Sequence, residues 1–362
     1  MKKVLVINNG TAGLFGFRQE VLEELCKNYA VTVLAKDTGN KNDLEKMGCT
    51  VILAELEYHG TNPFKELSLI RFYKRAIKKI KPDIVLTYTI KPNIYAGMSC
   101  AALNVPYIAN ITGLGTAVEK DSLIQKITIP LYRYGLRKAK KVFFQNKDNL
   151  KFMRKHKIVS DNYELLPGSG VNLERFKLMD YPIGEKVEFT FISRVMKEKG
   201  IDQYLEAAKT IHSKYPNTVF HVYGKCDGQY ESILSKMMDD GVIMYHGYTT
   251  DVISVHAKSS CTIHPSYYPE GMSNVILESA ACGRPVITTD RAGCREAVDN
   301  GITGYIVKQR DAQDLIKKIE EFLSLDWEQR RIMGIQGRLK VEREFDRNIV
   351  VNRYMEEVES GL

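Results

Sequence analysis

The first ten residues, Met1-Lys2-Lys3-Val4-Leu5-Val6-Ile7-Asn8-Asn9-Gly10, set the type of fold. A short apolar run that ends in a turn sequence is typical of a buried strand in a parallel sheet. The run is too short for a signal peptide, and nowhere do about 18 apolar residues follow one another, so we expect a cytoplasmic protein without a membrane-spanning helix.

A glycine-rich segment, Asn8 to Arg18, follows this strand with the spacing Gly-x-x-Gly-x-x-Gly. The spacing departs from the Gly-x-Gly-x-x-Gly fingerprint of dinucleotide sites, which disfavours a simple NAD site. A glycine-rich turn that opens a helix can still bring backbone close to a phosphate or a sugar. A tight structural turn would explain the same glycines.

Short apolar runs alternate with amphipathic stretches through the first half of the chain. The runs that we expect to be strands are Val4 to Ile7, Val31 to Leu34, Thr50 to Leu53, Ile84 to Thr87, Tyr107 to Asn110 and Lys141 to Gln145. Helical patterns fall between several of them, as at Phe17 to Asn28 and Leu67 to Lys81. This alternation predicts a parallel sheet covered on both faces by helices.

The alternation starts again after a segment rich in Pro, Gly and Ser, Leu166 to Asn172. The second set of expected strands is Glu188 to Ile192, Val219 to Tyr223, Ile243 to His246, Cys261 to His264 and Pro285 to Thr288. We therefore predict an α/β protein with two doubly wound, Rossmann-like domains, residues 1–167 and 168–339. Leu339 to Val358 should form a further helix, and from its pattern alone it could cap the second domain.

Composition is that of an ordinary soluble protein long enough for two cores, with 362 residues, 44% hydrophobic and 27% charged. The seven cysteines show neither Cys-x-x-Cys pairs nor a neighbouring histidine pattern, so no zinc site or disulfide framework is indicated.

Charge is unevenly distributed: residues 1–170 carry 27 Lys and Arg against 15 Asp and Glu, and the remainder carries 25 against 29. A basic first half suggests a polyanion or an anionic membrane surface as partner. Basic residues interleave with apolar ones at Leu67 to Lys81 and again at Arg133 to Lys141. Such helices also occur with the charged side merely solvated. No recognition motif accompanies the basic runs, so we expect no nucleic acid partner.

Two carboxylates, Glu270 and Glu278, flank a loop that turns into a helix. Ser273 suits the N-cap, where its hydroxyl can accept from first-turn amides. Gly271 permits close backbone approach, so the amides of Met272 to Asn274 could hold a phosphate while the carboxylates accept from hydroxyl groups. A ligand with both phosphate and hydroxyls suggests a sugar nucleotide. Acidic residues are, however, common near helix N-termini in any protein.

Further candidates leave the carboxyl ends of the expected strands, where open α/β sheets bind ligands. Arg194 and Lys199 follow the first strand of the second domain and could neutralise a diphosphate. Gly224 and the turn Gly247-Tyr248 follow the next two strands and would line the same crevice.

Taken in order, these motifs resemble the large retaining glycosyltransferase family 4. The resemblance rests on Ser193-Arg194-x4-Lys199-Gly200, Gly224, Gly247-Tyr248, His264-Pro265-Ser266-x3-Glu270-Gly271-x6-Glu278-x3-Cys282-Gly283-x-Pro285-Val286-Ile287, Ala292-Gly293-x2-Glu296 and Gly301-x2-Gly304. The first half is similar to the bacterial subgroup that extends polyprenyl-diphosphate-linked oligosaccharides or capsular repeats. That similarity rests on Asn62-Pro63-Phe64, Lys91-Pro92-Asn93-Ile94-Tyr95 and Gly113-Leu114-Gly115.

The resemblance implies a GT-B fold, with two Rossmann-like domains facing across a cleft and residues 340–362 packing back on the first domain. It implies that Arg194 and Lys199 hold the diphosphate of a UDP-sugar and that Glu278 accepts from the ribose hydroxyls. Glu270 would face the transferred sugar. The remaining donor contacts that it implies are Gly13, whose loop would close over the β-phosphate, Gly224, Tyr248, Gly271, Met272, Ser273 and Asn274.

Such enzymes need no metal or other cofactor, and the sequence has no Asp-x-Asp metal motif. Retention is usually drawn as a same-face displacement in which the leaving phosphate oxygen takes the acceptor's proton. Many relatives carry a histidine near the donor sugar where this sequence has Thr112 and Gly113. Thr112 and Gly113 could supply a hydroxyl or backbone contact there, and the loop histidine His59 is a spare candidate. Lys91, at a strand end, could meet the diphosphate of the acceptor, and Asn93 is a further acceptor-side candidate.

We thus expect a retaining, metal-independent transferase that moves a hexose or N-acetylhexosamine from a UDP-sugar to a polyprenyl-diphosphate-linked saccharide. It would be peripheral on the inner face of the cell membrane and would serve surface polysaccharide or glycan assembly. A UDP-sugar epimerase of the same fold is one alternative, and it would need no acceptor. A non-catalytic nucleotide-sugar-binding scaffold at the membrane is another, and it would tolerate loss of Glu270.

Overall fold

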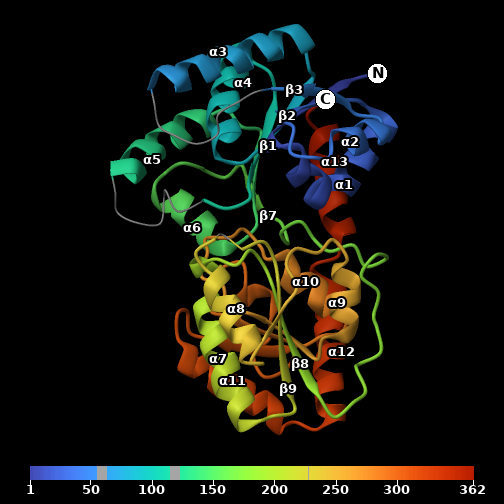
Figure 1. Ribbon diagram of the computed structural model, residues 1–362. Helices are drawn as coiled ribbons and strands as arrows, with labels where there is room; N and C mark the ends of the chain where they lie inside the picture. Colours follow the sequence, from blue (N-terminus) through green and yellow to red (C-terminus); the bar gives the residue numbers. More distant parts are fainter. Residues whose placement is uncertain (55–62, 115–122, 227) are drawn as a thin grey trace. The chain divides into compact units, whose positions relative to one another are not determined.

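The computed structural model describes residues 1–54, 63–114, 123–226 and 228–362. It divides into two compact units. Unit 1 comprises Met1–Ser169, Glu270–Met272 and Arg347–Leu362, and unit 2 comprises Gly170–Pro269 and Ser273–Asp346. Within each unit, helices cover both faces of one sheet (Figure 1).

The sheet of unit 1 has seven strands, all parallel, in the order β3-β2-β1-β4-β5-β6-β7. The strands are β1 Lys3–Gly10, β2 Ala30–Lys36, β3 Thr50–Leu53, β4 Ile84–Tyr88, β5 Tyr107–Ile111, β6 Lys141–Phe144 and β7 Tyr163–Leu165. The six strands predicted from the sequence are confirmed. The edge strand β7 was missed because three partly exposed residues give no apolar run.

Strand β1 explains why the sequence opens with an uninterrupted apolar run. Val4 and Val6 pack into one core, with residues of α1 and α13, and Leu5 and Ile7 pack into the core on the other face. Side chains of a strand point alternately to the two faces of a sheet, so burial of both faces requires apolar residues throughout.

The helices of unit 1 lie on either side of this sheet, α3 to α6 on one side and α1, α2 and α13 on the other (Figure 1). They are α1 Thr11–Asn28, α2 Lys41–Lys46, α3 Pro63–Ile80, α4 Gly97–Leu103, α5 Leu123–Leu136, α6 Lys147–Lys155 and α13 Arg347–Glu359, with a π-helical turn η1 at Pro92–Ala96. Gly135 lets α5 approach η1 closely, since a Cβ atom there would lie 2.6 Å from the carbonyl oxygen of Ile94.

The predicted single helix from Leu339 to Val358 is wrong in one respect, because it is two helices. Helix α12 ends at Glu344 and α13 begins at Arg347. Phe345 leaves helical geometry at φ −130°, and its carbonyl accepts a hydrogen bond of 2.8 Å from the backbone nitrogen of Val171 instead of continuing the helix. The break coincides with the change from unit 2 to unit 1.

Ion pairs and hydrogen bonds attach α13 to the rest of unit 1. Arg347 donates to both carboxylate oxygens of Glu20, at 2.9 and 2.7 Å. Lys140 and Lys141 both pair with Glu357, at 2.9 and 3.0 Å.

Unit 2 has a six-stranded parallel sheet in the order β10-β9-β8-β11-β12-β13. Its strands are β8 Val187–Ile192, β9 Thr218–Tyr223, β10 Met244–Tyr245, β11 Cys261–His264, β12 Val286–Thr289 and β13 Gly304–Val307. The five predicted strands are confirmed, and β13 is an additional edge strand. Its helices are α7 Ile201–Lys214, α8 Glu231–Asp239, α9 Val252–Lys258, α10 Asn274–Ala281, α11 Ala312–Ser324 and α12 Trp327–Glu344, with short 3₁₀ turns η3 Lys197–Lys199 and η4 Arg295–Ala297.

Two of the buried basic residues of unit 2, Arg284 and His256, are neighbours. Arg284 is fully buried, and its guanidinium donates to the carbonyl oxygens of His256 at 2.8 Å and Asp180 at 2.7 Å. His256 is also fully buried, and its ring nitrogens have no hydrogen-bond partner among the described residues. Burial, together with the charge of Arg284, lowers the pKa of His256 to about 3. The folded protein therefore holds this imidazole neutral.

Among the described residues, no helix combines the length and apolarity needed to cross a bilayer.

We predict that His256 makes unit 2 sensitive to acid. In the unfolded chain, His256 becomes protonated below the ordinary histidine pKa of about 6.5. In the folded protein it stays neutral down to about pH 3. This group should therefore lower the free energy of unfolding by about 1.4 kcal/mol for each pH unit between those limits. Urea unfolding at several pH values should show a shallower pH dependence for His256→Leu than for the wild type. Equal slopes would show that the imidazole can be protonated in place.

Candidate functional site

The loops that follow the strands of unit 2 all lie at the end of the sheet where the carboxyl ends of the strands meet, because all six strands run in the same direction. Arg194 follows β8 and is exposed, whereas Lys199 ends η3 and is only 9% exposed. Both cations lie over the ring of Tyr268, in the loop after β11, at 5.8 Å for the Arg194 guanidinium carbon and 5.1 Å for Lys199 Nζ. The structure thus gathers two positive charges at the edge where α/β sheets bind ligands.

Gly200 explains how Lys199 reaches this position. Its φ of 79° is left-handed, and a Cβ atom there would lie 2.1 Å from the carbonyl oxygen of Pro265. The backbone nitrogen of Tyr267 also donates to the carbonyl of Glu198 at 2.9 Å. The turn that carries Lys199 and the loop that carries Tyr268 are therefore in direct backbone contact, which no residue larger than glycine would permit.

Gly224 packs directly against the backbone of Ser193, the residue before Arg194. With φ at 151°, a Cβ atom on Gly224 would lie 1.7 Å from the carbonyl oxygen of Ser193. Its backbone nitrogen donates to Gly247 at 2.8 Å, which ties the ends of β9 and β10 together. Tyr248, also predicted to bind the donor, is exposed and lies under Lys225 Nζ at 5.2 Å.

Ser273 occupies the N-cap position of α10, as predicted, but the predicted hydrogen bond of its hydroxyl to the first-turn amides is wrong. In the described structure the hydroxyl bonds to Nε2 of His264 at 3.2 Å, and both side chains are buried. The amides at the start of α10 therefore have no side-chain cap from Ser273. Asn274 and Glu278 lie half-buried on this helix.

A second hydrogen-bond chain fixes the start of α10 through the motif Ala292-Gly293-x2-Glu296. The backbone nitrogen of Ser273 donates to the carbonyl of Gly293 at 2.8 Å, and Glu296 Oε2 accepts from the backbone nitrogen of Gly293 at 2.7 Å. Glu296 thereby positions the backbone from which α10 begins.

Glu270, Gly271 and Met272 belong to unit 1, although the chain on either side belongs to unit 2. Gly271 fits tightly there, since a Cβ atom would lie 2.1 Å from Gln145 Oε1 and 2.4 Å from the carbonyl oxygen of Thr112. Glu270 is half-buried. The structure therefore brings a predicted donor residue, Gly271, against a predicted acceptor residue, Thr112.

Asn146 also contacts this segment, and the sequence interpretation missed it. Its side-chain nitrogen donates to the carbonyl oxygens of Glu270 at 3.0 Å and Gly271 at 2.7 Å. The available signal was its place between an apolar strand and a polar helix start, which is where α/β proteins carry site residues.

Two other acceptor candidates are engaged inside unit 1. Lys91 forms an ion pair of 2.8 Å with Glu66, and both side chains are 14% exposed. Asn93 is 1% exposed, and its amide donates to the carbonyl of Asn110 at 2.8 Å and accepts from Thr87 Oγ1 at 2.7 Å. Asn93 therefore joins neighbouring strand ends, where the sequence suggested a contact with the acceptor.

Gly13 lies in a helix, which corrects its expected place in a loop. Strand β1 runs to Gly10 and α1 begins at Thr11, so Gly13 is in the first turn of α1. Thr38 Oγ1 accepts from the backbone nitrogen of Ala12 at 2.8 Å, which fixes this early start. His59 lies outside the described residues.

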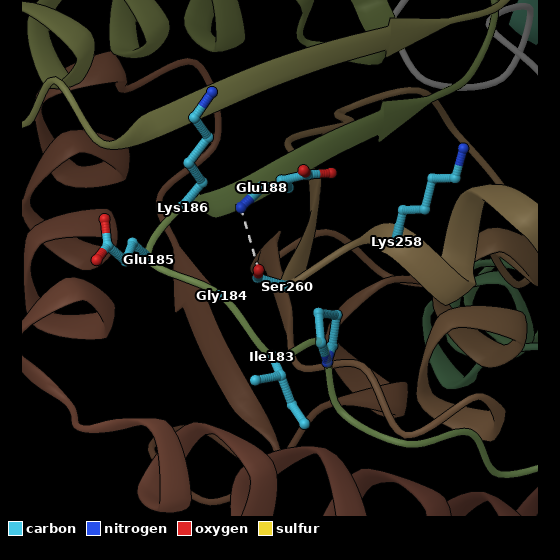
Figure 2. Close-up of a pocket in the computed structure, with 8 residues that line it drawn as sticks. Ile183, Gly184, Glu185, Lys186, Glu188, Lys258 and Ser260 are labelled. Atoms are coloured by element: carbon cyan, nitrogen blue, oxygen red, sulfur yellow. Dashed lines mark hydrogen bonds between the residues drawn. The ribbon is translucent and has the colours of Figure 1, made fainter.

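Two cavities of the described structure lie away from these residues. A cavity of about 240 Å³ lies beside the start of β8, where the backbone nitrogen of Glu188 donates to Ser260 Oγ at 3.0 Å (Figure 2). Another, of about 460 Å³, is lined by Arg133, Arg137, Arg154 and Lys157 among others. Neither includes a predicted site residue. Within the described part of the chain, no three His, Cys, Asp or Glu side chains gather as a group able to hold a metal ion.

Two family models match the chain. The model described as glycosyl transferases group 1 matches residues 180–340, and the model described as glycosyl transferase 4-like matches residues 3–146. The first covers the segment with Arg194, Lys199 and Glu278.

Curated relatives cover different shares of the chain. The N,N'-diacetylbacillosaminyl-diphospho-undecaprenol alpha-1,3-N-acetylgalactosaminyltransferase of Campylobacter jejuni is 24% identical over 371 residues, 96% of each chain. The capsular polysaccharide biosynthesis glycosyltransferase CapM of Staphylococcus aureus is 29% identical over 226 residues, 57% of this chain and 58% of that protein.

Solved structures share the fold at low identity. HepE of Anabaena, in complex with UDP and glucose, matches with a TM-score of 0.79 at 15% identity over 100% of both chains. Sucrose-phosphate synthase of Thermosynechococcus elongatus matches with a TM-score of 0.80 at 16% identity over 99% of both chains. The fold is thus of the GT-B type with two Rossmann-like domains, which confirms the fold prediction.

Proposed function

Because this chain belongs to the glycosyltransferases, we propose that it moves a hexose or N-acetylhexosamine from a UDP-sugar to a polyprenyl-diphosphate-linked saccharide, with retention of configuration. The observation that carries the proposal is the pair of cations over Tyr268 at the strand-end edge of unit 2. The Campylobacter jejuni relative, named for a diphospho-undecaprenol acceptor, supports the choice of acceptor. CapM supports a place in surface polysaccharide assembly.

Arg194 and Lys199 hold the donor's diphosphate in this proposal. Arginine offers a fork of donors and lysine a compact point charge, and together they offset the charge that develops on the leaving UDP. Glu278 accepts hydrogen bonds from the ribose hydroxyls. The bound UDP in HepE supports a uridine nucleotide in this fold.

The transfer step breaks the bond between the anomeric carbon and the diphosphate oxygen. The acceptor hydroxyl oxygen forms the new bond on the same face, and its proton passes to the leaving phosphate oxygen. Glu270 stabilises the positive charge of the oxocarbenium-like sugar and orients it, without acting as the base. The two basic residues take the charge-neutralising role, so the proposed reaction requires no metal cofactor.

We further propose that unit 1 meets the inner face of the membrane, where a lipid-linked acceptor resides. Helix α3 exposes a series of basic side chains: Arg71, Lys74, Arg75, Lys78 and Lys79. Helix α5 exposes Ile124, Ile127 and Tyr134. Helix α3 also exposes Leu67. Helices that expose both basic and apolar side chains are typical of those that lie on anionic bilayers.

The function is tested by incubating the protein with candidate UDP-sugars and a polyprenyl-diphosphate-linked saccharide. We expect release of UDP and a longer glycan. Glu270→Ala should lower kcat by at least about 10²-fold while UDP affinity changes little, because it removes stabilisation of the transition state alone. Glu278→Ala should weaken UDP binding by about tenfold or more, because hydrogen bonds to a charged acceptor contribute about 1.5–3 kcal/mol.

Other outcomes would identify the alternatives. Interconversion of UDP-sugars without any acceptor would replace the proposal with an epimerase. UDP-sugar binding without turnover for any donor and acceptor pair, unaffected by Glu270→Ala, would replace it with a scaffold.

The membrane contact predicts binding to vesicles that contain phosphatidylglycerol and not to phosphatidylcholine alone. Lys74→Gln combined with Lys78→Gln should weaken partitioning by about 30-fold at low salt, since each close basic residue contributes about 1 kcal/mol. Lys36→Gln combined with Lys46→Gln, near α2, is the matched control. Equal loss in both double variants would mean that only net charge matters and that α3 is not the contact.

A further inference from the structure

Asn146 is buried to 1% exposure, and both ends of its side-chain amide are used. Its oxygen accepts from the backbone nitrogen of Asn149 at 2.8 Å, as the N-cap of α6. Its nitrogen donates to the carbonyl oxygens of Glu270 at 3.0 Å and Gly271 at 2.7 Å. One side chain thus connects the start of α6 to the backbone that carries Glu270.

The cap fixes which way the amide faces. Reversing its oxygen and nitrogen would aim a donor at the amide N–H of Asn149 and an acceptor at two carbonyl oxygens, losing three hydrogen bonds in a buried place. The amide is therefore held with its nitrogen toward Glu270 and Gly271. Asparagine suits both tasks because it combines a good cap acceptor with two N–H donors.

Gly271 and Met272, the two residues after Glu270, are also closely packed. Gly271 lies against Thr112 and Gln145, and Met272 lies against Gly168, where a Cβ atom would be 2.5 Å from Met272 Cβ. These are steric contacts, which limit the movement of this backbone but do not set the direction of its peptide groups. The two hydrogen bonds from Asn146 set the direction of the two peptide groups that flank the Cα atom of Gly271, because one accepts through the carbonyl of Glu270 and the other through the carbonyl of Gly271.

We propose that Asn146 is a positioning residue for the Glu270 carboxylate, an inference that rests on the proposed function for the role of Glu270. With its carbonyl fixed, the main chain of Glu270 sets the direction of the Cα–Cβ bond from which the carboxylate extends, before any sugar binds. Misplacement of a reacting group by about 1 Å can cost about 10²-fold in rate. The effect should fall on transfer, because Asn146 has no described hydrogen bond with Arg194, Lys199 or Glu278, which hold the diphosphate and the ribose in the proposed function.

Two substitutions separate the donor role from the cap role. Asn146→Asp keeps an oxygen for the amide of Asn149 but places a carboxylate against two carbonyl oxygens. Asn146→Ser keeps a cap hydroxyl and removes the amide donors. Both should lower kcat by about 10- to 100-fold, with the KM for the UDP-sugar and the affinity for UDP alone within about threefold of the wild type.

Asn162→Ser is the matched control. Asn162 also lies in unit 1 and donates its side-chain amide to one backbone carbonyl, that of Ala139 at 2.7 Å. It has no described contact with residues 270–272, so its loss should leave kcat unchanged. Thermal unfolding of all three variants reports any general loss of folding.

Hydrogen exchange measured by mass spectrometry gives a readout without turnover. A peptide that spans Glu270 to Ser273 should exchange faster in Asn146→Ser than in Asn162→Ser or the wild type. If the wild type transfers no sugar, the proposed function fails and this exchange result alone decides the inference. Wild-type kcat in both Asn146 variants, or equal exchange in Asn146→Ser and the control, would overturn it.

Discussion

Both sheets are wholly parallel, and this constraint determines where chemistry can occur. Parallel strands release all their carboxyl-terminal loops at one edge, so residues far apart in the chain become neighbours there. In unit 2 this brings Arg194 and Lys199, after β8, onto the ring of Tyr268, after β11. In unit 1 the same edge carries Thr112 after β5 and Asn146 after β6.

Backbone contacts, more than side-chain pairs, hold these loops in place. Gly200 lies against Pro265, Gly224 against Ser193, and Gly271 against Thr112, each at a distance that excludes a Cβ atom. Such contacts cannot be relaxed by a change of rotamer. The cationic and carboxylate side chains therefore extend from rigid backbone, which reduces the entropy lost when a ligand binds.

The sequence was sufficient for the strands with apolar runs and for the gathering of Arg194 with Lys199, because periodicity and strand-end position are local signals. It was insufficient where long-range contacts decide. The hydroxyl of Ser273 was expected to cap α10, but it forms a hydrogen bond with the buried His264 instead. Arg284 occupies an unspecified position of the Cys282-Gly283-x-Pro285 motif, yet it lies fully buried on backbone carbonyls. Asn146 has no motif of its own, and only folding brings it to Glu270.

The account depends most on the claim that Arg194 and Lys199 bind the diphosphate of the donor. Calorimetric titration with UDP and with uridine measures this directly, because the two ligands differ only by the diphosphate. We expect the wild type to bind UDP at least about 10²-fold more tightly than uridine, since charged hydrogen bonds contribute about 1.5–3 kcal/mol each. In Arg194→Gln combined with Lys199→Gln that ratio should fall to about tenfold or less, with uridine affinity unchanged. An unchanged ratio in the folded double variant would contradict the account.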